Sequence, residues 1–216
     1  LPSLDELSIL NCYDEWRRKI GLTFASIPSG VRKLELAITL GKSSNLSKHL
    51  PHLTTLDIIC SDVSEYSWMI HSPKTLTSLR LYCWDGSVAL PSSLIHFKVH
   101  TVALSASTFV SNLPPQLESF VVTYQAAGAD LIVPLLPTST RKLSFGTRTR
   151  IPAGHATPRT FFEQLPKSLT DFQVPHCPGV NFGANPELIS LLPSTMRILP
   201  EATIFPVLRL QVTLSA

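Results

Sequence analysis

The stretch Leu90-Pro91-Ser92-Ser93-Leu94-Ile95-His96-Phe97-Lys98-Val99 decides the fold of this chain. It reads as a proline turn followed by the pattern L-x-x-F-x-V, and this alternation of apolar residues is typical of a strand with one buried face. The same phrase runs through the whole sequence. Eight clear copies begin at residues 4, 31, 53, 76, 94, 117, 140 and 169, and a proline precedes each start by two or three residues. A ninth, less regular copy begins at Met196, and residues 207–210 are predicted to form a tenth strand.

A phrase that returns every 18 to 29 residues predicts a stacked repeat array. Each unit of such an array packs on its neighbours, so chain length adds units and not separate domains. With 44% hydrophobic and 15% charged residues, the sequence lies outside the range of disordered chains. Ten of the 18 prolines lie two or three residues before a copy, where a fixed φ favours the turn and the extended residue before it. The sequence has no apolar run of about 18 residues, so we expect no transmembrane helix and no membrane partner.

The repeated phrase resembles the leucine-rich repeat superfamily. Its L-P-x-S-L form is similar to the proline-bearing repeats of some bacterial effectors and to the FNIP-type repeats of amoebae. The resemblance implies an α/β fold, a curved solenoid of about nine repeats with a parallel inner sheet and short helices or turns outside. It covers residues 1–216 as a single domain, which we expect to be an excerpt of a longer protein. The usual asparagine three residues after the last apolar position is replaced, for example by Trp84 and Val102, so we expect no asparagine ladder.

Two helix starts and two longer loops interrupt the later repeats. Thr157-Pro158 and Asn185-Pro186 each join a favoured N-cap residue to a proline suited to the first turn of a helix. Extra loops are predicted over residues 146–156 and 175–184. Insertions in repeat proteins often lie on the binding face, although drift without function explains them equally well.

The polar residues between the apolar ones are predicted to line the inner, concave wall, because strand side chains alternate between two faces. Residues 66–159 carry eight basic and three acidic side chains, and arginine and tyrosine are favoured anchors of protein interfaces. We therefore expect an acidic protein or peptide to bind here; the alternative is an ordinary solvated wall. The expected partner-binding residues are Arg80, Tyr82, His96, Lys98, Tyr124, Arg141 and Lys142.

Other function classes find little support in the sequence. A net charge of +3 falls short of the basic footprint expected for binding nucleic acid. His96 and His100 have the spacing of a metal pair on a helix, but on a strand they lie ~13 Å apart, so we expect no metal site. Gly41-Lys42-Ser43 lacks the earlier glycine of a phosphate loop, and no catalytic or cofactor motif is present. We expect a non-enzymatic interaction scaffold without a cofactor. The alternative is the substrate-recognition arm of an F-box-type or effector-type ubiquitin ligase.

The cysteines bear on the cellular compartment. Cys60 and Cys83 follow adjacent predicted strands one repeat apart, and the ~4.8 Å between such strands is within reach of a disulfide. We expect both thiols to be reduced and the protein to be cytoplasmic or nuclear, with secretion left open.

Overall fold

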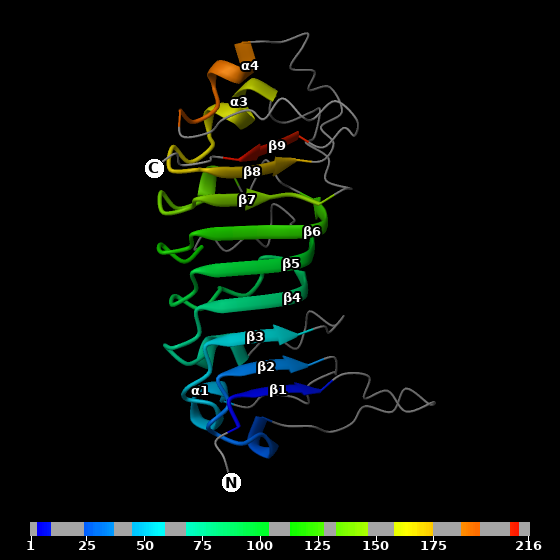
Figure 1. The fold of residues 1–216 in the computed structure, drawn as a ribbon, viewed down its shortest axis with the longest axis vertical. Coiled ribbons are helices and arrows are strands. Elements are labelled where there is room, and N and C mark those ends of the chain that lie inside the picture. Colours follow the sequence, from blue (N-terminus) through cyan, green and yellow to red (C-terminus); the bar gives the residue numbers. More distant parts are fainter. Residues whose placement is uncertain are drawn as a thin grey trace, which may run out of the picture.

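The chain forms a single open sheet of nine strands in the order of the sequence, β1 to β9 (Figure 1). This computed structural model describes residues 4–9, 24–36, 45–58, 68–103, 113–127, 133–146, 158–174, 187–194 and 208–211. The strands are β1 (Glu6–Ile9), β2 (Lys33–Leu36), β3 (Thr55–Ile58), β4 (Ser78–Trp84), β5 (His96–Ala103), β6 (Ser119–Ala127), β7 (Lys142–Ser144), β8 (Asp171–Val174) and β9 (Leu208–Gln211). Strands β1 to β8 are parallel, and β9 pairs antiparallel with β8.

The eight clear copies of the repeat phrase correspond to the eight parallel strands. Each strand begins two residues after the first apolar residue of its copy. The expected tenth strand exists as β9, but it runs against the others, so its apolar run is not a further copy of the repeat. Met196, where we expected a ninth copy, lies outside the described residues. The described part of the chain therefore holds eight parallel strands and one returning strand.

Short helices and 3-10 turns connect several of the strands. They are η1 (Phe24–Ser26), α1 (Leu46–His49), η3 (Val133–Leu135), α3 (Pro158–Glu163) and α4 (Glu187–Ser190). Helices α3 and α4 begin where the two proline signals predicted them. They contribute Phe161, Phe162 and Leu188 to the buried core. None of the helices described here has the length and apolar character needed to cross a membrane.

The three apolar positions in the copies of β2 to β7 form the core, whereas Leu4 in the copy of β1 is 43% exposed. In the copy of β5, Leu94, Phe97 and Val99 have at most 1% of their surface exposed. Thr140 takes the first apolar position in the copy of β7 and is fully buried. Its hydroxyl donates a hydrogen bond to the carbonyl of Leu117 at 3.1 Å, which satisfies the buried polar group.

The central strands β4, β5 and β6 are longer than the sequence predicted. They continue past the last apolar position of their copies and include Tyr82, His100 and Tyr124. The extension follows from a further buried position, which Trp84 fills on β4 and Val102 on β5. The ring of Trp84 packs edge-on against Phe97, with 5.4 Å between centroids. Apolar packing thus occupies the place of the missing asparagine.

The carbonyl groups of the turn prolines accept the hydrogen bonds that close the turns. The backbone N–H of Leu94 donates to the carbonyl of Pro91 at 3.1 Å, and that of Leu76 donates to Pro73 at 3.0 Å. The same three-residue closure recurs at Pro28, Pro114, Pro137 and Pro166. A proline at the first position of a turn needs only its carbonyl, so its missing N–H costs the turn nothing.

A ladder of side-chain donors ties the turns before β4 to β8 to the preceding repeat. The hydroxyl of Ser139 lies 2.8 Å from the carbonyl oxygen of Pro115 and 3.0 Å from that of Leu117. The other members are Thr75, Ser93, Gln116 and Ser168, each donating to a backbone carbonyl of the repeat before it. This ladder stands at the turns that lead into β4 to β8 and joins each of these repeats to the one before it.

Candidate functional site

Two rows of side chains run across the exposed face of the sheet, which we call the open face. The first row is Glu6, Lys33, Thr55, Ser78, His96, Ser119, Lys142 and Asp171. The second row, two residues further along each strand, is Ser8, Glu35, Asp57, Arg80, Lys98, Val121, Ser144 and Gln173. The members of each row are partners in the strand register. Each residue of the second row lies between the last two apolar positions of its copy, so the alternation along the strand places all of them on the same face.

Ion pairs between neighbouring strands neutralise most of the charge in these rows. Four acidic and four basic side chains belong to them, so the two rows have no net charge. The pairs are Lys33 with Glu6, Arg80 with Asp57 at 3.0 Å, and Lys142 with Asp171 at 3.1 Å. Three basic side chains of residues 66–159 lie in these rows, and carboxylates from the neighbouring strands β3 and β8 neutralise two of them.

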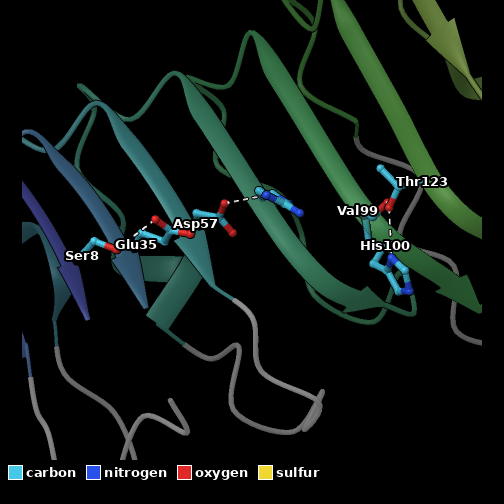
Figure 2. Close-up of polar contacts among 7 residues, drawn as sticks. Ser8, Glu35, Asp57, Val99, His100 and Thr123 are labelled. Carbon is cyan, nitrogen blue, oxygen red and sulfur yellow. Dashed lines mark hydrogen bonds and ion pairs between the residues drawn. The ribbon is translucent and has the colours of Figure 1, made fainter. Parts of the chain in front are cut away.

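Glu35 and Lys98 are the two charged side chains of the rows that the ion pairs leave over. Glu35 accepts a hydrogen bond from the Ser8 hydroxyl at 2.9 Å (Figure 2), and no described cation pairs with it. Lys98 has no ion-pair or hydrogen-bond partner among the described side chains, and it is exposed. Between them lies the Asp57–Arg80 pair, so an unpaired acid and an unpaired base flank a neutralised centre.

Asp57 is the most constrained side chain of the second row. Burial raises the pKa of its carboxyl group, while the charge of Arg80 and its hydrogen bond act in the opposite direction. The neighbouring carboxylate of Glu35 raises the pKa further. The Oδ2 atom binds Arg80, whereas Oδ1 is shielded from solvent and has no hydrogen-bond partner among the described residues. Burial thus outweighs the ion pair at this site.

A column of three stacked rings stands beside the second row, formed by Tyr82, His100 and Tyr124 on β4, β5 and β6. The ring of His100 lies 5.0 Å from that of Tyr82 with 21° between planes, and 5.0 Å from that of Tyr124 with 8° between planes. These separations match the spacing of adjacent strands, ~4.8 Å, because the rings stand upright on neighbouring strands. Tyr82 is 41% exposed.

An irregularity in β6 completes the column. Val99 pairs with Val122, but Thr101 pairs with Gln125, so two residues of β6 oppose His100. One of them, Thr123, lies with its hydroxyl 3.1 Å from His100 Nδ1 (Figure 2), and the other, Tyr124, stacks on the ring. Such a bulge re-aims a side chain without ending the strand pairing. Strand β6 therefore contacts the imidazole at Nδ1 and by stacking, and Tyr82 of β4 stacks on it as well.

Two depressions of the open face meet at β3. The larger, of about 480 Å³, extends from Asp57 across Arg80, Lys98 and Lys142 to Gln173. The smaller, of about 380 Å³, contains Glu6, Lys33, Glu35 and Asp57. Thr55 and Asp57 line both of them. The open face thus offers one elongated surface from β1 to β8, with Glu35 on β2 near one end and Lys98 on β5 near the middle.

The seven residues expected to bind a partner lie close together, but they differ in their surroundings. Arg80 and Lys98 belong to the second row, His96 and Lys142 to the first, and Tyr82 and Tyr124 to the aromatic column. Arg141 is exposed directly before β7. Arg80 and Lys142 are already engaged by carboxylates, which leaves Lys98 and Arg141 as the cations without a described acidic partner.

Glu35 and His100 also belong to this surface, but they are not among the seven residues expected from the sequence. The charge was summed over long segments, in which a single carboxylate such as Glu35 does not stand out. The role of His100 follows only from its stacking in the folded chain. The expected loop residues 147–156 and 175–184 lie outside the described residues, as does Cys60. Cys83 is an unpaired thiol whose pKa is raised by burial.

His96 and His100 both lie on β5, as the strand prediction required. Among the described residues, no group of three or more His, Cys, Asp or Glu side chains is placed to hold a metal ion. Comparisons with known proteins give no relatives: no family model, no curated protein and no solved structure matches this chain.

Proposed function

We propose that this chain is a leucine-rich-repeat type of solenoid that binds a segment of another protein on its open face. The coincidence of the eight repeat phrases with eight in-register parallel strands supports this kinship. Solenoids of stacked units present extended surfaces of this kind to partners. The role is that of a binding module and not of an enzyme.

The observation that carries the proposal is the adjacency of Lys98 to the aromatic column. Lys98 and His100 are separated by one residue on β5, so their side chains leave the strand on the same face. Lys98 has no described acidic partner, and a carboxylate of a bound protein would supply one. Tyr82 and His100 add apolar and hydrogen-bonding surface beside it, which is the composition that protein interfaces favour. The partner that fits this surface is an acidic protein or peptide.

Blocking the larger depression tests the proposal. Val121 lies in the middle of this depression, is half-buried and makes no ion pair, so Val121→Trp should fill the surface without breaking the charge network. The control is Thr138→Trp, at an exposed turn outside both rows. Proteins captured by the wild type and by Thr138→Trp, but lost with Val121→Trp, are the expected result. A set of captured proteins that Val121→Trp leaves unchanged, or the absence of any capture, contradicts the proposal.

A further inference from the structure

We infer that the bound segment is bipolar, with a basic side chain that pairs with Glu35 and an acidic side chain that pairs with Lys98. The inference rests on the proposed function and specifies the partner's chemistry. It adds that one half of the open face selects a positive charge, although the sequence pointed only to a negative one.

Only two charged side chains of the rows remain available to a partner. The Lys33–Glu6, Arg80–Asp57 and Lys142–Asp171 pairs already satisfy six of the eight charged side chains in the two rows. A ligand that used these groups would have to break an existing ion pair. Glu35 and Lys98 can each accept a partner without such a loss. Charge complementarity therefore assigns the two recognition points.

The register fixes the distance between these points. Glu35 lies on β2 and Lys98 on β5, in the same row, with the Asp57–Arg80 pair on the two strands between them. Three strand spacings of ~4.8 Å place the two positions ~14 Å apart. An extended chain advances ~3.3 Å per residue, so opposite charges about four residues apart in an extended peptide would reach both.

The shape of the surface favours a ligand that lies across the strands. The smaller depression contains Glu35, the larger contains Lys98, and Asp57 lines both, so a single segment can follow them without interruption. The aromatic column stands beside Lys98 and not beside Glu35. An apolar or aromatic residue next to the acidic residue of the partner therefore fits beside Lys98, whereas Glu35 takes the basic residue.

The test uses a displayed library of random twelve-residue peptides, selected separately against the wild type and against single variants of the whole chain. Glu35→Gln and Lys98→Met remove one charge each and keep the side-chain volume nearly unchanged. Glu187→Gln on α4 and Lys74→Met in an exposed turn are matched controls outside the two rows. Selected peptides are then synthesised, and their dissociation constants are measured by fluorescence anisotropy at low salt, with Val121→Trp included.

Peptides selected on the wild type should carry a basic and an acidic residue about four positions apart. Glu35→Gln should abolish the preference for the basic residue, Lys98→Met the preference for the acidic one, and each should weaken a selected peptide about two- to five-fold because these ion pairs are exposed. The two control variants should select the same peptides as the wild type. Peptides that lose affinity with Val121→Trp but show no paired charges, or that ignore Glu35→Gln and Lys98→Met, overturn the inference while leaving the proposed function intact. If no peptide is enriched, or if the enriched peptides bind Val121→Trp unchanged, the proposed function fails and the inference fails with it.

Discussion

Gly146 lies directly against the backbone of Tyr124. A Cβ atom added to Gly146 would stand 2.4 Å from the Tyr124 nitrogen and 2.6 Å from its Cα. The contact lies at the bulge in β6, where Thr123 and Tyr124 together oppose His100. The absence of a side chain at residue 146 is therefore coupled to the position of Tyr124 in the aromatic column.

Gly146→Ala should lower the free energy of unfolding by about 1–3 kcal/mol, because backbone atoms cannot rotate away from the added methyl group. The matched control is Gly30→Ala, where a new Cβ meets no atom within 4 Å. That change should leave stability unchanged or raise it by up to about 1 kcal/mol through the unfolded chain. Urea unfolding of both variants measures the difference. Equal effects of the two substitutions would show that β6 does not press on Gly146.

His100→Ala should cost about 1–2 kcal/mol, because it removes a ring that stacks on both Tyr82 and Tyr124. The same substitution at His96 is the natural control. His96 belongs to the same strand and is exposed, and no described side chain stacks on it. Its loss should change stability by less than about 0.5 kcal/mol. Thermal unfolding of the two alanine variants compares them, and an equal cost at both positions would argue against the stack as a source of stability.

Ser139→Ala should reduce the free energy of unfolding by about 1 kcal/mol, since its hydroxyl serves the carbonyl groups of Pro115 and Leu117 in the preceding repeat. Ser92→Ala removes the same hydroxyl one turn position earlier in another repeat, where the side chain is exposed and has no described partner. It should be nearly neutral. Chemical denaturation distinguishes the two. A neutral Ser139→Ala would mean that the donor ladder does not hold the repeats together.

The sequence predicted the strands and their register well, because one rule governs both. The L-x-x-L-x-L alternation sends Leu79 and Leu81 into the core and Arg80 to the open face, and the same spacing in each copy aligns Arg80 with Asp57 and Lys98. Burial of one face makes this register costly to shift, since a slip by one residue would expose every apolar side chain. The spacing of the apolar residues and the burial of one face therefore specify the sheet, whatever the protein binds.

The details of the open face depend on contacts that periodicity does not encode. The pairing of Arg80 with Asp57 involves residues 23 positions apart, so it becomes visible only when neighbouring strands are placed side by side. The bulge at Thr123 is one extra residue in an otherwise regular strand, and no glycine or proline marks it. Segment charge sums therefore predicted a basic wall, whereas strand pairing produces a neutral one with two unpaired charges.

Asp57→Asn should increase stability relative to the wild type as the pH rises. Because burial raises the Asp57 pKa above its ordinary value of 3.8, the folded protein retains this proton over a pH range in which the unfolded chain has lost it. The wild type accordingly loses stability as the pH rises from 3.8 through the raised pKa, and asparagine cannot ionise. The difference in free energy of unfolding between variant and wild type should grow across that window and then stay constant. Urea unfolding at a series of pH values measures it.

A second variant separates the causes of this shift. Arg80 acts to lower the Asp57 pKa, so Arg80→Met should move the titration of Asp57 to still higher pH. The carboxyl carbon of Asp57, followed by NMR in the wild type and in Arg80→Met, reports both titrations directly. A wild-type midpoint below 3.8 would show that attraction to Arg80 and not burial controls this carboxylate, whereas a midpoint that falls when Arg80 is replaced would show that Arg80 does not lower the Asp57 pKa.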